Sequence, residues 1–187
     1  MSGDVVKTFN ISRLIDRMAA KYGLRLNETP IGFKFIAELM LKGDVLIGGE
    51  ESGGMGIKGH LPERDGVLAG LLLAELMAFK KKSLDKILDD ISKEHGYFYY
   101  DRLDLHLSDE KKNKAIELLK NNPPKELGGL AVKEIQSLDG TKLIFDDGSW
   151  ILFRPSGTEP LLRVYCEAPS KEAVATLLQE SRLWMSL

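Results

Sequence analysis

The chain has 187 residues, of which 43% are hydrophobic, 29% charged and 7% aromatic. These fractions are typical of a soluble globular protein and exclude wholesale disorder, and the length allows one large domain or two small ones. The 26 basic side chains against 28 acidic ones give a formal charge of −2, so there is no basic excess for binding nucleic acid.

Residues 1–96 alternate short, β-branched strands with segments of helical periodicity. The pattern predicts strands at 5–9, 24–28 and 44–47, and helices at 11–22, 36–42, 64–79 and 84–91. A glycine-rich loop, residues 48–59, follows the third strand. This alternation predicts an α/β domain with a mainly parallel sheet covered by helices.

From Tyr97 the pattern changes to that of an α+β domain with an antiparallel sheet and flanking helices. Strands are expected at 97–107, 131–138, 142–145, 149–153 and 161–168, and helices at 108–120 and 173–184. Asp139-Gly140 and Asp147-Gly148 supply the chemistry of hairpin turns. We therefore predict two domains, residues 1–96 and 97–187.

No segment of the sequence predicts attachment to a membrane or export. The longest apolar run, residues 66–79, is shorter than the roughly twenty residues that a bilayer crossing needs, and it is interpreted as a buried helix. Residues 1–4 have neither a basic region nor an apolar stretch. The chain enters its first strand abruptly, as if in the middle of a domain.

Several features resemble functional motifs but are better explained by structure. Residues 54–59 match G-x-G-x-x-G, but a strand does not lead directly into them and Pro62 precedes the next helix, which argues against a nucleotide site. The histidines, His60, His95 and His106, are scattered, so no metal site is expected. The single cysteine, Cys166, excludes a disulfide, fits a reduced cytoplasmic protein and is interpreted as a core residue.

Residues 154–160, Arg-Pro-Ser-Gly-Thr-Glu-Pro, lie between two predicted strands and offer the groups that bind a phosphate. Arg154 supplies a guanidinium fork, Ser156 and Thr158 supply hydroxyls, and Gly157 allows close approach of the backbone. Arg163 supplies a second cation in the next strand. A plain polar hairpin loop with an incidental arginine explains the same residues equally well.

Residues 48–54, Gly-Gly-Glu-Glu-Ser-Gly-Gly, follow a predicted parallel strand. Ligands of α/β sheets collect at the carboxyl ends of the strands, where this loop is expected. Its carboxylates and hydroxyl are suited to binding sugar hydroxyls. A flexible turn whose acids face water is the alternative interpretation.

Taken together, these segments resemble the α-D-phosphohexomutase superfamily, with the best match in its phosphoglucomutase/phosphomannomutase branch. The matching segments span essentially the whole chain: residues 5–8, 29–34, 50–54, 62–66 and 154–160. The resemblance implies an incomplete third domain followed by the fourth domain of a four-domain cytoplasmic enzyme. Such an isomerase, an intramolecular phosphotransferase, interconverts hexose 1-phosphate and hexose 6-phosphate in carbohydrate metabolism.

The resemblance also implies what the chain lacks. In the family, a phosphoserine of the first domain transfers the phosphoryl group, a Mg²⁺ ion is held by the second domain, and glucose 1,6-bisphosphate is the intermediate or activator. Neither the serine motif nor the aspartate-rich loop occurs in this sequence. We therefore expect no catalytic residue or metal ligand here, and no activity from the chain alone. The missing first two domains are its implied partners, and self-association through exposed apolar surface is expected.

The same resemblance assigns site residues. Glu50 and Ser52 are implied to bind sugar hydroxyls, with Lys7 and Arg64 as further cations of the sugar site. The implied phosphate-binding residues are Arg154, Ser156, Gly157, Thr158 and Arg163. Phe33 stands where the family places an aromatic residue or histidine, and is expected to pack against the sugar. A stand-alone regulatory module that binds phosphosugars without catalysis is the alternative function. The sequence does not indicate whether glucose or mannose is the preferred hexose.

Overall fold

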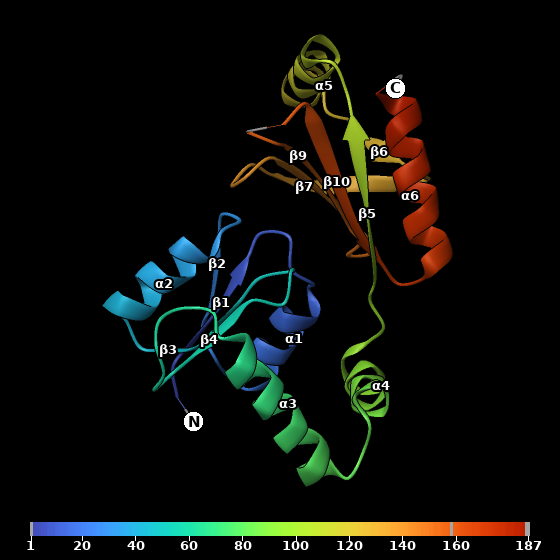
Figure 1. The fold of residues 1–187 in the computed structure, drawn as a ribbon. Coiled ribbons are helices and arrows are strands. Elements are labelled where there is room, and N and C mark those ends of the chain that lie inside the picture. Colours follow the sequence, from blue (N-terminus) through green and yellow to red (C-terminus); the bar gives the residue numbers. More distant parts are fainter. Residues whose placement is uncertain (1, 158, 186–187) are drawn as a thin grey trace. The chain divides into compact units, whose positions relative to one another are not determined.

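The computed structural model describes residues 2–157 and 159–185 and divides the chain into two units (Figure 1). The N-terminal unit comprises residues 1–97 and the C-terminal unit residues 98–187. Each unit has its own sheet and its own helices.

The sheet of the N-terminal unit is mainly parallel, as the sequence predicts. It contains β1 (Asp4–Thr8), β2 (Leu26–Thr29), β3 (Val45–Gly49) and β4 (Met55–Ile57) in the order β2-β1-β3-β4. β1 is parallel to both of its neighbours, whereas β3 and β4 form an antiparallel hairpin. β4 lies within residues 48–59, a segment that the sequence pattern indicates as loop. Because β1, β2 and β3 are parallel, the loops that follow them share one edge of the sheet.

Four helices accompany this sheet: α1 (Leu14–Lys21), α2 (Phe33–Lys42), α3 (Gly66–Lys80) and α4 (Leu84–His95). α2 forms a small core with the strands, in which Phe33, Ile36, Val6 and Val45 are buried. The close approach of α2 depends on two glycines that are paired across β3 and β4. A Cβ atom at Gly48 would lie 2.3 Å from Cγ2 of Ile36, and one at Gly56 would lie 2.9 Å from Sδ of Met40.

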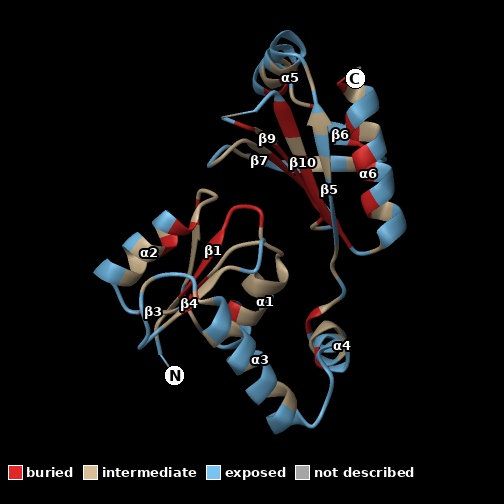
Figure 2. Ribbon diagram, in the orientation of Figure 1, coloured by how far each residue is buried: buried red, intermediate tan, exposed pale blue. Residues whose placement is uncertain are grey.

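The interpretation of residues 66–79 as a buried helix is wrong. The helix forms, but no residue of α3 is buried, and the side chains of Val67 and Phe79 are 77% and 80% exposed (Figure 2). The segment is apolar on all sides, so its sequence predicts burial without specifying a covering surface. Within the described part of this unit, only α4 packs against α3 to a notable extent. Self-association through this exposed surface stays a prediction.

The C-terminal unit has the predicted α+β arrangement. Its strands are β5 (Tyr99–His106), β6 (Glu126–Leu127), β7 (Leu130–Gln136), β8 (Thr141–Phe145), β9 (Trp150–Pro155) and β10 (Leu161–Ala168). They form an antiparallel sheet in the order β5-β10-β9-β8-β7-β6. The helices are α5 (Asp109–Asn121) and α6 (Lys171–Trp184), and the hydroxyls of Ser108 and Ser170 cap their first turns. Among the described residues, no helix is long and apolar enough to cross a membrane.

Both helices of the C-terminal unit pack on the same face of the sheet and enclose its core. The strands contribute Leu143, Phe145, Ile151, Phe153, Leu162, Val164, Cys166 and Ala168, and the helices contribute Ala115, Leu119, Val174, Leu177 and Leu178. Residues alternate between the two faces of a strand. Arg154 and Arg163 therefore lie on the face opposite α5 and α6, since their neighbours Phe153 and Val164 lie in the core.

Cys166 is predicted to be unreactive in the folded chain. Its side chain is fully buried, and burial raises the pKa of its thiol, with Glu167 adding a smaller electrostatic effect. Because the thiolate is the reactive form, a disulfide reagent should not label the native chain at mildly alkaline pH. Complete labelling is expected after denaturation. Rapid labelling of the native chain would contradict the packing of β10 described above.

Candidate functional site

The loop between β3 and β4, residues 50–54, is a closed hairpin loop at the carboxyl end of β3. The N–H of Glu50 donates to the carbonyl oxygen of Gly54 at 2.8 Å, and the N–H of Gly53 donates to that of Glu50 at 3.0 Å. Gly53 has a φ of 91°, a conformation that favours glycine. The carboxylate of Glu50 is largely buried, whereas Ser52 is exposed. Glu50 and Ser52, the two residues implied to bind sugar hydroxyls, thus lie on one short loop.

Arg64 braces this loop from the segment that precedes α3. Its Nη1 atom lies 3.4 Å from Oε2 of Glu50, and its guanidinium carbon lies 5.4 Å from the ring centroid of Phe33. A Cβ atom at Gly54 would lie 2.6 Å from Cδ of Arg64, so this glycine makes room for the arginine. The structure therefore brings Arg64 and Glu50 together, and the arginine side chain remains 55% exposed. Phe33 is 4% exposed, which contradicts its expected packing against a sugar.

The start of α3 is fixed next to Arg64 by Asp65. Its carboxylate accepts the N–H groups of Val67 and Leu68, and Nε2 of His60 lies 3.0 Å from Oδ2. The N–H of Leu68, and secondly His60, hold the pKa of the Asp65 carboxyl below its usual value. The cap therefore stays charged at neutral pH and keeps the segment that carries Arg64 in place.

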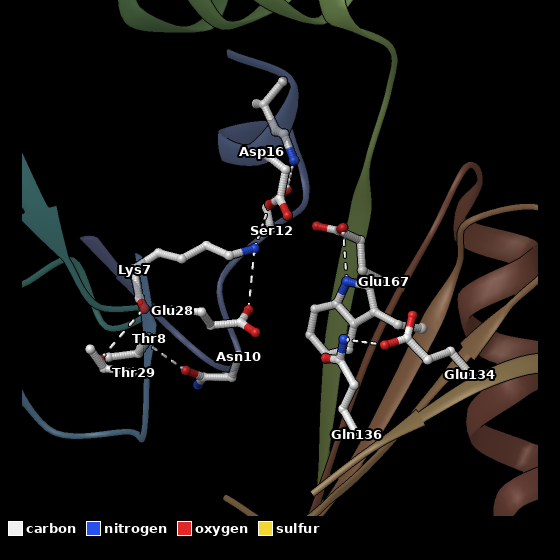
Figure 3. A network of polar contacts seen from close by, with 12 residues as sticks. Lys7, Thr8, Asn10, Ser12, Asp16, Glu28, Thr29, Glu134, Gln136 and Glu167 are labelled. Carbon is white, nitrogen blue, oxygen red and sulfur yellow. Dashed lines mark hydrogen bonds and ion pairs between the residues drawn. The ribbon is translucent and has the colours of Figure 1, made fainter. Parts of the chain in front are cut away.

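Lys7 is not an accessible cation in this structure. It is 2% exposed, and its Nζ atom forms an ion pair with Asp16 and lies 3.4 Å from Oε1 of Glu28 (Figure 3). Two carboxylates, from α1 and from β2, therefore neutralise it. The structure does not bring the Lys7 ammonium to the Glu50 loop as a free sugar ligand, and its predicted role there stays a prediction.

Asn10, which sequence reasoning missed, links the end of β1 to the same loop. The hydroxyl of Thr8 donates to Oδ1 of Asn10 at 3.0 Å, and Nδ2 of Asn10 lies 3.5 Å from Oε2 of Glu51. Asn10 is 2% exposed. Its position three residues beyond Lys7 gives no local signal of this contact, which depends on β1 and β3 lying side by side.

The segment from Arg154 onward connects β9 to β10. Arg154 and Pro155 are the last residues of β9 rather than part of the loop. The N–H of Ser156 donates to the carbonyl oxygen of Leu161 at 2.8 Å, and the Ser156 hydroxyl accepts the N–H of Glu159 at 3.2 Å. These bonds close the base of the loop. Thr158, implied as a phosphate ligand, lies outside the described residues.

Neither crowding by described atoms nor a left-handed backbone conformation requires a glycine at position 157. A Cβ atom at this position would meet none of the described atoms within 4 Å, and its φ lies outside the left-handed region. Gly54, by contrast, makes room for a neighbouring side chain. Gly66 and Gly70 are equally uncrowded, so the role of Gly157 in close approach of a ligand stays a prediction.

Arg154 and Arg163 lie directly opposite each other on β9 and β10. Directly opposed residues of antiparallel strands share a face, and like charges there are destabilising. Each guanidinium has a carboxylate nearby: Nε of Arg154 is 3.1 Å from Oδ2 of Asp139, and Nη2 of Arg163 is 3.3 Å from Oε2 of Glu159. The two arginine side chains are 22% and 28% exposed. An anion between them would relieve their repulsion.

Lys112 adds a third cation at this loop, which sequence reasoning also missed. Its Nζ atom donates to the carbonyl oxygen of Glu159 at 3.3 Å, and the side chain is only 13% exposed. The residue lies in α5, and nothing in its local sequence indicates contact with the loop between β9 and β10. Tertiary packing alone brings it there.

A buried polar cluster lies on the arginine-bearing face of the sheet. The indole N–H of Trp150 donates to Oε1 of Glu167 at 3.0 Å (Figure 3), and Nζ of Lys142 lies 4.5 Å from the centroid of one of the Trp150 rings. All three residues are almost fully buried. Trp150 and Glu167 are opposed in the register that also opposes Arg154 and Arg163. The cluster therefore fixes the alignment of β9 and β10 on which the arginine pair depends.

Among residues 2–157 and 159–185, no three His, Cys, Asp or Glu side chains gather in a way that could hold a metal ion. The chain's described residues therefore do not fit a Mg²⁺ site.

Each of the two units matches a domain of a known protein family. Residues 1–95 match "phosphoglucomutase/phosphomannomutase, alpha/beta/alpha domain III", and residues 106–183 match the C-terminal domain of the same family. The two halves of the chain thus match two domains of one family of enzymes. The chain belongs to the phosphoglucomutase/phosphomannomutase family and corresponds to its C-terminal portion.

Individual relatives agree with this assignment. A phosphoglucomutase/phosphomannomutase of Thermococcus kodakarensis is 32% identical over 95% of this chain, and a phosphoglucomutase of Komagataeibacter xylinus is 34% identical over 89%. The chain spans only 36% and 32% of the length of these relatives.

The fold agrees with solved structures of the same kind. A Thermus thermophilus protein assigned as a phosphomannomutase is 38% identical, with a TM-score of 0.80. The match covers 100% of this chain and 37% of that protein. Parafusin, a phosphoglucomutase of Paramecium, is 27% identical, with a TM-score of 0.78 over 98% of this chain and 37% of its own.

Proposed function

We propose that this chain is the sugar- and phosphate-binding part of an enzyme that interconverts hexose 1-phosphate and hexose 6-phosphate. In this proposal residues 98–187 bind the phosphate that is not reacting, and residues 1–97 bind the sugar. The reaction proceeds through glucose 1,6-bisphosphate or the corresponding bisphosphate of another hexose. Membership of the phosphoglucomutase/phosphomannomutase family supports this proposal.

The cross-strand pair Arg154 and Arg163 carries the proposal. A phosphate monoester has about −1.5 to −2 charges near neutral pH and presents several strong acceptor oxygens. Two guanidinium groups on one face of the sheet, beside the open backbone at Gly157, offer donors of the matching sign. Ser156 adds a hydroxyl at the base of the same loop. An incidental arginine in a polar hairpin would not explain a second arginine directly opposite.

The Glu50 loop supplies the complementary chemistry for the sugar. The Glu50 carboxylate accepts hydrogen bonds from sugar hydroxyls, and the exposed Ser52 hydroxyl can donate or accept one. Arg64 limits the freedom of the Glu50 carboxylate, which reduces the entropy lost on binding. In this proposal, different residues bind the hydroxyls of the sugar ring and the phosphate. This separation suits a substrate whose two ends react in turn.

The transfer step itself lies outside this chain in the proposal. The serine that carries the phosphoryl group and the Mg²⁺ ion that assists the transfer belong to the first two domains of the complete enzyme. The residues present here contribute positioning and neutralisation of charge, which account for most of the catalysis of phosphoryl transfer. We therefore expect the chain alone to bind hexose phosphates and to show no mutase activity.

Ligand titration of the isolated chain tests the proposal. We expect glucose 6-phosphate to bind with a dissociation constant of about 1 mM or weaker, a free energy of about −4 kcal/mol or less in magnitude. Ligand-observed NMR suits this range, with unphosphorylated glucose as the control and mannose 6-phosphate as a second hexose. Glucose should bind much more weakly, because it lacks the group that the arginines hold.

The same titration distinguishes the alternatives. Equal binding of glucose and glucose 6-phosphate, or binding of neither, would contradict the proposed phosphate site. Micromolar binding without mutase activity would instead favour a stand-alone phosphosugar-binding module, since a site that needs the remaining domains should not reach that affinity alone. Conversion of glucose 1-phosphate by the purified chain would contradict the expected absence of a catalytic group.

A further inference from the structure

Asp139 stands out because it touches Arg154 from a different hairpin. It lies in the turn between β7 and β8, whereas Arg154 ends β9. Nε of Arg154 and Oδ2 of Asp139 are 3.1 Å apart, and their side chains are 22% and 23% exposed. This contact is an ion pair without the geometry of a hydrogen bond, because the buried Nε of Arg154 donates to no acceptor among the described residues. The Asp139 carboxylate lies beside the edge of the guanidinium that is next to the aliphatic stem.

The turn that carries Asp139 is seated directly on the backbone of β9. A Cβ atom at Gly140 would lie 2.4 Å from the carbonyl oxygen of Phe153 and 3.2 Å from Cα of Arg154. Gly140 also has a φ of 103°, which favours glycine. Thr141, the next residue, is opposed to Phe153 in the β8–β9 register. The position of Asp139 relative to Arg154 is thus set by backbone contact as well as by charge.

We propose that Asp139 is a positioning residue that orients the Arg154 guanidinium for phosphate binding. The inference rests on the proposed function of the loop between β9 and β10. The charge of the carboxylate beside Nε favours one orientation of the long Arg154 side chain, whose two Nη groups carry the remaining donors. Those groups form the edge that binds two oxygens of a phosphate.

An electrostatic and an entropic effect of Asp139 on phosphate binding oppose each other, and their balance decides whether Asp139→Asn weakens or strengthens binding. The negative charge weakens the attraction of the site for an anion, whereas the fixed rotamer of Arg154 lowers the entropy lost when the anion binds. In addition, Asp139 offsets the repulsion of Arg154 by Arg163 when no ligand is bound. If Asp139 is a positioning residue, the affinity gained by orienting Arg154 exceeds the affinity lost through the negative charge of Asp139.

The test is a double-mutant cycle on the whole chain with glucose 6-phosphate as the probe. Asp139→Asn keeps the shape of the side chain and removes its charge, and Asp147→Asn is the matched control in the equivalent Asp-Gly turn between β8 and β9. We expect Asp139→Asn to weaken binding about three- to tenfold, the effect of freeing one long side chain. Asp147→Asn should leave binding unchanged.

The coupling energy between Asp139 and Arg154 distinguishes a positioning role of Asp139 from a general effect of its substitution on folding. In the Arg154→Ala background, Asp139→Asn should have no further effect, because no guanidinium remains to be oriented. The side-chain ¹⁵Nε–H resonance of Arg154 should also shift in Asp139→Asn and not in Asp147→Asn. An equal loss of affinity with and without Arg154 would overturn the inference, as would unchanged or tighter binding in Asp139→Asn.

Failure of the inference and failure of the proposed function give different results. If Arg154→Ala weakens binding of glucose 6-phosphate and Asp139→Asn does not, the phosphate site stands and the positioning role falls. If Arg154→Ala itself leaves the affinity unchanged, the assignment of the phosphate site is wrong, and the positioning role of Asp139 falls with it.

Discussion

Replacing Arg154 by alanine should weaken the binding of glucose 6-phosphate by roughly tenfold or more. A hydrogen bond to a charged group contributes about 1.5–3 kcal/mol, and a guanidinium can make two of them to one phosphate. Arg163, directly opposite, would be left as the remaining guanidinium of the pair. Because the wild-type affinity is expected to be millimolar, the variant should bind with a dissociation constant of tens of millimolar, which ligand-observed NMR can still measure.

The control for Arg154→Ala is an arginine of the N-terminal unit. Arg25 is an exposed side chain, 3.8 Å from a carboxylate oxygen of Asp4, and Arg25→Ala removes the same charge from the chain. A general effect of net charge would lower the affinity of both variants alike. The assignment of the phosphate site predicts that only Arg154→Ala loses affinity, and an unchanged affinity in that variant would contradict it.

Replacing Phe153 by alanine should destabilise the C-terminal unit by about 3–5 kcal/mol, the usual cost of deleting a buried aromatic side chain. The ring is 1% exposed and lies in the core between the sheet and its helices. The two tryptophans of the chain, Trp150 and Trp184, both lie in the C-terminal unit. Tryptophan fluorescence in a urea titration therefore reports the unfolding of this unit.

Leu183→Ala is the matched control for Phe153→Ala. Leu183 lies in the same unit, on α6, and its side chain is 62% exposed. Its removal should change the free energy of unfolding by less than about 0.5 kcal/mol, as is usual for surface positions. A small effect of Phe153→Ala, comparable to that of Leu183→Ala, would contradict the placement of the core on the helix-bearing face of the sheet.

The periodicity of the sequence was sufficient to predict the class of each sheet and the described helices and strands other than β4 and the two-residue strand β6. The strands β8 to β10 are short apolar runs bounded by turn residues, a signal that is visible locally in the sequence. β4 escaped prediction because its three residues, Met55–Ile57, lie among glycines that serve the packing of α2 and Arg64. The burial of α3 was predicted wrongly because apolar composition does not specify a covering surface.

The candidate site was predictable only where its chemistry lies on one continuous segment. Glu50 with Ser52, and Arg154 with Ser156 and Gly157, could be chosen because loop residues of the right types stand together in the sequence. The residues that support them come from elsewhere: Asn10 follows β1, Lys112 lies in α5, and Asp139 lies in a neighbouring turn. The neutralisation of Lys7 likewise depends on α1 and β2, whose side chains reach it only in the folded unit.

Mapping the binding of glucose 6-phosphate on the backbone amides of ¹⁵N-labelled chain tests the central proposal most directly. The account predicts that the N–H resonances of Ser156 and Gly157 shift on titration, that those of residues 50–54 shift to a smaller extent, and that glucose alone leaves Ser156 and Gly157 unchanged. Saturable shifts that avoid Ser156 and Gly157, or that glucose reproduces in full, would contradict it.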